Sequence, residues 1–247
     1  MILSIENILF FLALLPVVSF LYASVGHGGA SGYLALMALF SFPSTIMKQT
    51  ALLLNLFVAA VAFYHYFRAG HFRFKLFLPF ILTSIPAAFV GGMLDLDPEI
   101  YRKILGVLLL VTVYRILMVW EHKQQSSKAV SLYLGLFFGL GIGFFSGLIG
   151  IGGGIILTPV ILLFHWGNMK QAAAVSALFI WVNSASGLLG QFRSGVVLEF
   201  QSLLLVGIAL IGGMAGAYFG SSKMKNRTLQ YFLAVVLFSA SIKLLFV

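Results

Sequence analysis

Long apolar runs dominate this chain and limit what it can fold into. Of its 247 residues, 61% are hydrophobic and 9% are charged, whereas soluble domains have about 45–50% apolar and about 25% charged residues. A water-soluble fold cannot bury this much apolar surface, so lipid must be the solvent for most of the chain. A helix needs about 20 mostly apolar residues to span a bilayer. We therefore expect an all-α polytopic membrane protein without a sizeable soluble domain.

Polar residues divide the chain into ten apolar segments, each predicted to be a helix. The segments are 6–25, 29–42, 49–67, 76–94, 100–119, 130–149, 152–165, 170–191, 200–220 and 228–247. Two of them, 29–42 and 152–165, are short, because a helix of about 14 residues reaches about 21 Å, less than the roughly 30 Å of the hydrocarbon core. Each follows a glycine cluster, so we expect a broken helix or a re-entrant element at both places.

The two halves of the chain repeat one another at a nearly constant spacing. The matched stretches are Val25-Gly26-His27-Gly28-Gly29 with Ile149-Gly150-Ile151-Gly152-Gly153, Met47-Lys48-Gln49-Thr50-Ala51 with Met169-Lys170-Gln171-Ala172-Ala173, and Arg68-Ala69-Gly70 with Arg193-Ser194-Gly195. With five crossings in each half, the second half is inverted relative to the first, as in many secondary transporters. We predict a first transmembrane repeat at 1–121, a polar linker at 122–129 and a second repeat at 130–247.

The basic residues predict an orientation. The formal net charge is +9, and in membrane proteins lysine and arginine accumulate on cytoplasmic loops. With ten crossings, ten of the 15 basic residues share one side: Arg68, Arg73, Lys75, Arg115, Lys123, Lys128, Lys170, Lys223, Lys225 and Arg227. This split places both termini outside an inner (plasma) membrane. If the two short segments do not cross, the split becomes about even and the rule gives no orientation.

The glycine-rich junction before each short segment is the strongest candidate for a binding site. The first junction reads Gly26-His27-Gly28-Gly29-Ala30-Ser31-Gly32, and the second runs from Ser146 to Gly154. Glycine permits a break in a helix, and a helix that restarts within the membrane presents free N–H donors and the positive end of its dipole. Two such ends from inverted halves would form an anion site. Close helix packing is the alternative, since glycine is also common at membrane helix interfaces.

The predicted substrate site consists of backbone groups and small polar side chains. Its candidate residues are Gly28, Gly29, Ser31, Gly32, Asn55, Gly152, Gly153, Gly154, Ser176 and Asn183. Asn55 and Asn183 stand out because an amide deep in an apolar segment needs a partner. His27 lies inside the first cluster, where the second has Ile151. An ionisable residue at membrane depth is functional by default, so His27 is a candidate contact for a proton or the substrate.

Other classes of site are disfavoured by what the chain lacks. All six carboxylates lie at segment ends or in loops: Glu6, Asp95, Asp97, Glu99, Glu121 and Glu199. Because none of them lies within a span, a carboxylate proton relay in the membrane is disfavoured. Cysteine is also absent, which disfavours a thiolate metal site and, together with the placement of the carboxylates, an intramembrane enzyme. Neither glycine pattern of nucleotide-binding loops occurs. We expect no cofactor, no metal and no nucleic acid, but a small anionic solute and the lipid bilayer as partners; monomer and homo-oligomer both remain open.

The second junction carries a family resemblance. The stretch Gly143-Phe144-Phe145-Ser146-Gly147-Leu148-Ile149-Gly150-Ile151-Gly152-Gly153-Gly154, followed by Pro159, resembles the glycine pattern of the sulfite exporter TauE/SafE family. The resemblance covers the whole chain, with a weaker copy of the pattern at Gly26–Gly32. It implies a transporter of sulfite, sulfoacetate, other sulfonates or organic acids in a prokaryotic inner membrane. This sequence departs from the family at His27, where a small or apolar residue is more usual.

The first glycine cluster departs from the family pattern in two more ways. The first copy lacks the Ser-Gly before its cluster and the Pro after it, so the two halves need not contribute equally to the site.

We predict a secondary transporter that works by alternating access. The alternatives are a passive anion channel with the same glycine-lined site and a carrier of a non-sulfur organic acid.

Overall fold

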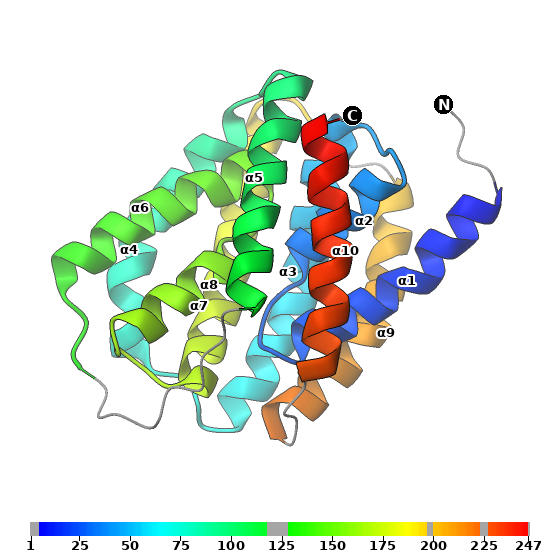
Figure 1. Cartoon of the computed structure of the whole chain (residues 1–247). Helices are drawn as coiled ribbons and strands as arrows, with labels where there is room; N and C mark the ends of the chain where they lie inside the picture. Colours follow the sequence, from blue (N-terminus) through cyan, green and yellow to red (C-terminus); the bar gives the residue numbers. More distant parts are fainter. Residues whose placement is uncertain (1–4, 118–127, 197–199, 223–226, 247) are drawn as a thin grey trace.

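The computed structural model describes residues 5–117, 128–196, 200–222 and 227–246, and within them it contains ten helices and no strand (Figure 1). The helices are α1 (Ile5–Ala23), α2 (Ala30–Leu39), α3 (Ser44–Arg68), α4 (Phe74–Met93), α5 (Pro98–Leu117), α6 (Leu132–Ile149), α7 (Gly154–Leu163), α8 (Met169–Arg193), α9 (Phe200–Ser222) and α10 (Arg227–Phe246). Each overlaps one of the ten predicted segments, although α3 begins at Ser44 rather than at 49. The expected all-helical architecture is therefore confirmed for the described residues.

Local sequence explains where several helices begin. Asn168 caps α8 through a capping box, in which its side chain accepts from the backbone N–H of Gln171 and the Gln171 side chain accepts from the backbone N–H of Asn168. At α5, Pro98 occupies the first helical position, where its missing N–H costs nothing. The Asp97 carboxylate before it accepts from the backbone N–H of Glu99 at 2.8 Å.

Matching turns end the matching helices of the two halves. After α3 and α8, which have 25 residues each, Gly70 (φ 75°) and Gly195 (φ 85°) take the left-handed conformation that ends helices. The Arg-x-Gly stretch therefore recurs in both halves because glycine readily takes the backbone conformation that ends the helix there. After α2 and α7, the same conformation falls on Ser41 (φ 60°) and His165 (φ 57°), which are not glycines.

Helices of the two sequence halves pack against one another throughout the structure. The central helices α3 and α8 lie side by side; α4 packs on α6 and α8, α9 packs on α1 and α3, and α5 packs on α10 (Figure 1). The predicted repeats 1–121 and 130–247 therefore share one interior. Most of the predicted linker 122–129 lies outside the described residues.

Glycine lets two of these pairs approach closely. On α6, a stripe of glycines at four-residue spacing faces the backbone of α4, where a Cβ on Gly139, Gly143 or Gly147 would meet a carbonyl oxygen. On α9, Gly212 and Gly216 meet the backbone of α1 in the same way, and Gly220 meets that of Ser24 just after α1. Small residues at helix interfaces are typical of membrane proteins, where backbones pack through direct van der Waals contact.

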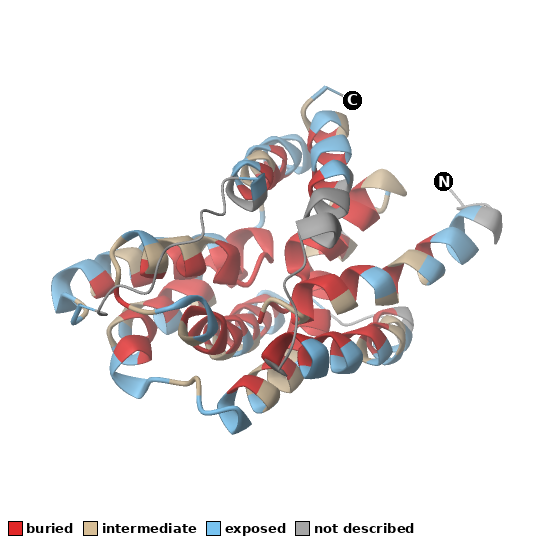
Figure 2. Cartoon of the chain, turned by 60° about the horizontal axis from the view of Figure 1, so that its bottom comes forward, coloured by how far each residue is buried: buried red, intermediate tan, exposed pale blue. Residues whose placement is uncertain are grey.

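The outer surface of the structure is apolar. Figure 2 shows buried residues facing the middle of the bundle and exposed residues on its outside, and the exposed ones include Phe137 (71% exposed), Leu163 (69%) and Ile211 (67%). Five helices among the described residues are long and apolar enough to cross a membrane: Ile46–Arg68, Phe74–Met93, Leu132–Ile149, Met169–Arg193 and Ser202–Ser221. Lipid tails solvate large apolar side chains that are exposed on such helices.

The two short helices, α2 and α7, begin inside the bundle and run outward in different directions (Figure 1). The far end of α2 lies beside α10, where the ammonium of Lys243 donates to the carbonyl oxygen of Leu39 at 2.8 Å. The far end of α7 lies beside the segment that precedes α6, where the backbone N–H of Lys128 donates to the carbonyl oxygen of His165 at 2.8 Å. The two helix N-termini are thus left in the interior, where the glycine clusters are.

Candidate substrate site

Both glycine clusters have backbone conformations that favour glycine. Gly29 (φ 99°) precedes α2, and Gly152 and Gly153 (both φ 77°) precede α7. Other residues are strained at these angles. No side chain caps either helix start, so the first N–H groups of α2 and α7 have no partner within their own helix. Two sets of N–H donors and the positive ends of two helix dipoles therefore lie in the buried interior.

The side chain of Asn55 on α3 lies between the two clusters. A Cβ on Gly28 would be 2.5 Å from its Oδ1, and a Cβ on Gly152 would meet its Nδ2. Only glycine leaves room for the amide on both sides. Asn55 is fully buried, and neither its Oδ1 nor its Nδ2 has a hydrogen-bond partner in the described part of the chain. A buried polar group without a partner costs about 1–3 kcal/mol, so this amide is a strong candidate for a ligand contact.

Ile180 on α8 is the positional counterpart of Asn55. The two residues occupy the same position in helices of 25 residues each. The Ile180 side chain would be 2.9 Å from a Cβ on either Gly28 or Gly152, and it also approaches Gly154. Between Gly28 and Gly152 the α3 side is therefore polar at Asn55, and the α8 side is apolar at Ile180.

His27 connects the first cluster to the second half through hydrogen bonds. Its Nδ1 is 3.0 Å from the carbonyl oxygen of Val25, and its Nε2 is 3.2 Å from both the carbonyl oxygen of Gly154 and Oγ1 of Thr158. Thr158 Oγ1 is in turn 2.8 Å from Oγ of Ser176 on α8. All three side chains are buried. This is a polar chain from the α1–α2 loop across α7 to α8.

Two other predicted residues hold the start of α2 against α1. Oγ of Ser31 lies 2.5 Å from the hydroxyl oxygen of Tyr22. A Cβ on Gly32 would meet the side chains of Val18 and Tyr22. The structure thus gives both residues a packing contact at the start of α2 and leaves any ligand contact to their backbone groups.

Gly29 and Gly153 are enclosed by side chains of neighbouring helices. A Cβ on Gly29 would be 2.5 Å from the ring of Tyr33, and a Cβ on Gly153 would be 2.7 Å from Ile142 and 2.9 Å from Phe179. Neither glycine lies against Asn55 as Gly28 and Gly152 do. Their side-chain-free backbones are required by close packing as well as by their positive φ angles.

Asn183 is only partly satisfied by hydrogen bonds. Its Nδ2 donates to the carbonyl oxygen of Phe179 at 2.8 Å, while its Oδ1 has no partner among the described residues. Further buried side-chain atoms without a partner in that part of the chain are Gln49 Oε1, Ser84 Oγ, Ser146 Oγ, Ser184 Oγ and Gln191 Nε2. They lie on α3, α4, α6 and α8, and α8 packs on each of the other three.

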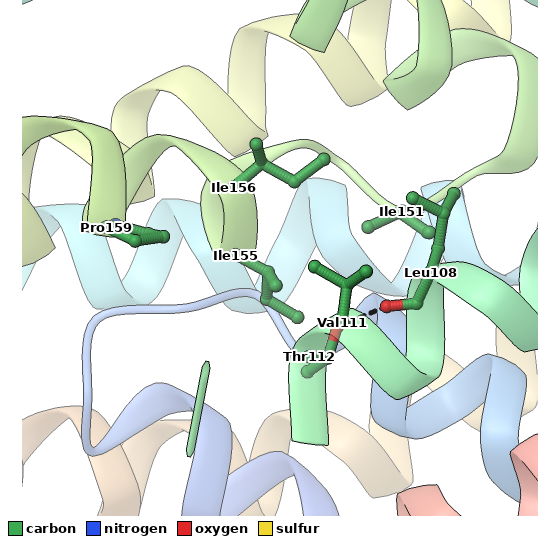
Figure 3. Close-up of a pocket in the computed structure, with 7 residues that line it drawn as sticks. All are labelled: Leu108, Val111, Thr112, Ile151, Ile155, Ile156 and Pro159. Atoms are coloured by element: carbon green, nitrogen blue, oxygen red, sulfur yellow. Dashed lines mark hydrogen bonds between the residues drawn. The ribbon is translucent and has the colours of Figure 1, made fainter. Parts of the chain in front are cut away.

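A small apolar cavity of about 70 Å³ adjoins the second cluster (Figure 3). It is lined by Leu108, Val111, Thr112, Ile151, Ile155, Ile156 and Pro159. Its one polar side chain, Thr112, donates its hydroxyl to the carbonyl oxygen of Leu108 at 2.8 Å. The side chains that line this cavity therefore offer no free donor to an anion.

The sequence did not single out two residues of this site. Thr158 is the one hydroxyl-bearing residue in the short segment 152–165, and that isolation was a usable signal. Ile180 gave no signal, because an isoleucine in an apolar helix is expected to pack against lipid or protein. Its contact with the clusters depends on how α3 and α8 meet.

Comparison with known proteins adds an independent observation to this geometry. The family profile described as Sulfite exporter TauE/SafE matches residues 9–244. The chain belongs to this family. The match extends from within α1 to within α10, so the two glycine junctions and the helices around them all lie inside it.

Relatives along the full length carry the same kind of name. The chain is 36% identical over 236 residues to the "Probable membrane transporter protein y4hK" of Sinorhizobium fredii, covering 93% of this chain and 94% of that protein. It is 26% identical over 247 residues to the "Probable membrane transporter protein YjnA" of Bacillus subtilis, covering 89% and 92%. No solved structure matches the chain. Family and relatives indicate a membrane transporter rather than an enzyme.

Proposed function

We propose that this member of the TauE/SafE family is a secondary transporter that moves a small sulfur-containing or organic anion, such as sulfite, sulfoacetate or another sulfonate, by alternating access. The observation that carries the proposal is the buried Asn55 amide between Gly28 and Gly152, with both of its polar atoms unpartnered among the described residues. A membrane protein gains nothing in stability from such a group, so its benefit lies in binding.

The arrangement suits an oxyanion. Sulfite and sulfonate oxygens accept several hydrogen bonds, and the starts of α2 and α7 offer backbone N–H donors from two directions. Nδ2 of Asn55 adds a side-chain donor between them. The positive ends of the two helix dipoles contribute without requiring a buried lysine or arginine. A bound anion would therefore be held mainly by backbone groups of both glycine clusters.

Alternating access requires two parts that move against each other, and two inverted halves would provide them. Reciprocal contacts between the halves support an inverted repeat. Gly26 of the first junction lies against Ala173 on α8, while Gly150 of the second junction lies against Lys48 on α3. Each junction thus rests on the central helix of the other half. In inverted-repeat transporters, rocking of one half against the other exposes a fixed midplane site to alternate sides.

The proposed location is the inner membrane, with both termini outside. In Figure 1 the start of α1 and the end of α10 both lie in the upper half of the molecule, which supports an even number of crossings. The excess of basic residues on the loops of the other side then assigns that side to the cytoplasm.

Ligand-dependent thermal stability tests the binding site. We expect sulfite or sulfoacetate to raise the melting temperature of the detergent-purified protein, because a ligand of the native state stabilises it. Asn55→Leu should abolish the shift while leaving the unliganded melting temperature equal or higher, since it removes an unpartnered amide. The control Thr112→Val lies outside the clusters and should keep the full shift. An undiminished shift in Asn55→Leu would refute this site.

Transport assays separate the alternatives. In proteoliposomes, a carrier shows saturable uptake and counterflow driven by trapped solute, whereas a passive anion channel shows neither. Uptake of acetate or another carboxylate without uptake of any sulfur anion would retain the carrier and reassign it to non-sulfur organic acids.

A further inference from the structure

The hydrogen bonds of His27 support a specific role in the proposed transport, and this inference rests on the proposed function. We propose that His27 binds one proton together with the anion, so that the protein carries the two in the same direction. The proton is held by the chain of His27, Thr158 and Ser176, which joins the first glycine junction to α7 and α8.

Both ring nitrogens of His27 face carbonyl oxygens. Nδ1 lies 3.0 Å from the oxygen of Val25, and Nε2 lies 3.2 Å from the oxygen of Gly154. A carbonyl oxygen only accepts hydrogen bonds. A neutral imidazole carries one N–H, so in either tautomer one nitrogen presents its lone pair to a carbonyl oxygen. The imidazolium has two N–H groups and donates to both carbonyls. These two carbonyl acceptors can therefore both be satisfied only by the protonated ring.

Among these contacts, the Thr158 hydroxyl is the group that can stabilise the neutral ring, because it can donate a hydrogen bond to the lone pair of Nε2. With the proton on Nδ1, the Thr158 hydroxyl can donate to Nε2 and accept from Ser176. When the ring is protonated, Nε2 donates instead, and the Thr158 hydroxyl turns to donate to Ser176 at an Oγ–Oγ distance of 2.8 Å. Hydroxyl groups rotate freely enough to serve either state. The chain therefore accommodates both protonation states without moving a helix.

Anion and proton binding reinforce each other at this position. His27 bonds the first residue of α7, Gly154, and the positive end of that helix disfavours a cation beside it. An anion bound at the same helix end neutralises this field and adds attraction to the imidazolium. By linkage, the anion strengthens proton binding by the same factor as the proton strengthens anion binding.

Three titratable groups on the elements around His27 form hydrogen bonds with other residues. The hydroxyl of Tyr22 on α1 is bonded to Ser31, and that of Tyr66 on α3 donates to the carbonyl oxygen of Ser24. On α8, Lys170 donates to the carbonyl oxygen of Ser221. The helix α7 contains no titratable residue.

Calorimetry of anion binding tests the proposal directly. Sulfoacetate is the probe, because it stays fully ionised at neutral pH and does not itself take up a proton. Titrations in two amine buffers of different ionisation enthalpy, free of sulfonate and phosphate, give the number of protons taken up per anion. We expect uptake to rise to about one proton per anion at the pH of strongest coupling. His27→Gln should bind sulfoacetate more weakly with no proton uptake, whereas the control His65→Gln should match the wild-type protein.

A second variant tests the chain without removing the histidine. Thr158→Val keeps the side-chain shape and removes the hydroxyl that stabilises the neutral ring, so the proton uptake should persist to higher pH. This variant also serves if His27→Gln does not fold.

Each contrary outcome has a distinct meaning. Sulfoacetate binding with no proton uptake at any pH would overturn the role of His27 and leave the proposed anion transport intact. Uptake that persists in His27→Gln, or a Thr158→Val profile that moves to lower pH, would overturn the assignment of the proton to this chain. If neither sulfoacetate, sulfite nor acetate binds the wild-type protein, the proposed function fails and this inference fails with it.

Discussion

The side-chain amide of Asn55 on α3 lies so close to Gly152 that a Cβ at that glycine would overlap its nitrogen. The same amide approaches Gly28 in the other half of the chain, where a Cβ would be 2.5 Å from Oδ1. One residue therefore contacts both glycine junctions, and the absence of side chains at the two glycines makes this contact possible.

A substitution at Gly152 has two effects, contact of the new side chain with Asn55 and backbone strain, and a matched control separates them. We expect Gly152→Ala to lose most transport and substrate binding, because the new methyl group displaces the Asn55 amide. Gly195→Ala is the matched control, since Gly195 also has positive φ (85°) but has no atom within 4 Å of a Cβ. Both variants should lose about 1–3 kcal/mol from backbone strain. Equal transport in the two variants, measured as sulfoacetate uptake into proteoliposomes, would contradict the role of the close approach.

Lys48 stabilises the end of α4. Its ammonium donates to the carbonyl oxygens of Gly91, Gly92 and Leu94, the last at 2.9 Å, and so satisfies carbonyls that α4 cannot pair internally. We expect Lys48→Met to lower the unfolding free energy by about 1–2 kcal/mol and the melting temperature with it.

The control for this prediction is Lys103→Met, which removes an exposed lysine that pairs with Glu99. Exposed ion pairs contribute little, so its melting temperature should stay close to that of the wild-type protein. If the two variants melt together, Lys48 has no special role at the end of α4.

The glycine stripe of α6 predicts a contrast within one helix. A Cβ on Gly147 would overlap the carbonyl oxygen of Ala88 on α4, whereas a Cβ on Gly141 would enter open space. Gly147→Ala should therefore destabilise the protein by about 1–3 kcal/mol, because the two helices must move apart. Gly141→Ala should be neutral or stabilising by up to about 1 kcal/mol, through helix propensity. Fluorescence-detected melting of both variants checks the prediction, and a reversed order would contradict the packing of α4 on α6.

His71, in the loop between α3 and α4, predicts a dependence of stability on pH. Burial lowers the pKa of His71 below its usual value, and the nearby Lys170 ammonium lowers this pKa further. The unfolded chain therefore binds more protons at this residue, so its contribution to stability is present above about pH 6.5 and is lost as the pH falls below that value.

Melting temperatures of the wild-type protein and His71→Gln, measured between about pH 8 and pH 5, check this expectation. We expect the acid-induced decrease to be smaller in His71→Gln, and also in Lys170→Gln, because that variant removes the charge that disfavours the imidazolium. Parallel curves for the wild-type protein and His71→Gln would show that other groups cause the decrease.

The sequence by itself determined the class of protein and the course of its helices. Runs of apolar residues fix helices in lipid, because every backbone N–H and C=O must then be paired within the segment. Glycines at Gly29 and Gly153 fixed the breaks, since only glycine takes positive φ without strain. The repeated Arg-x-Gly stretches likewise placed helix ends, at Gly70 and Gly195. These signals are local, and local signals can be read from the chain.

Only the tertiary structure decided which residues meet. The amides Asn55 and Asn183 look equivalent in the sequence, yet Asn55 lies between the clusters and Asn183 bonds its own helix through Phe179. Ile180 looks like any other apolar residue in the sequence, yet it lies against Gly28 and Gly152 across from Asn55. Likewise, Thr158 lies within hydrogen-bond distance of His27. These contacts join elements that are far apart in the chain, and they depend on how α3 and α8 pack. That packing is set by the side chains of both halves at once, so no single segment encodes it.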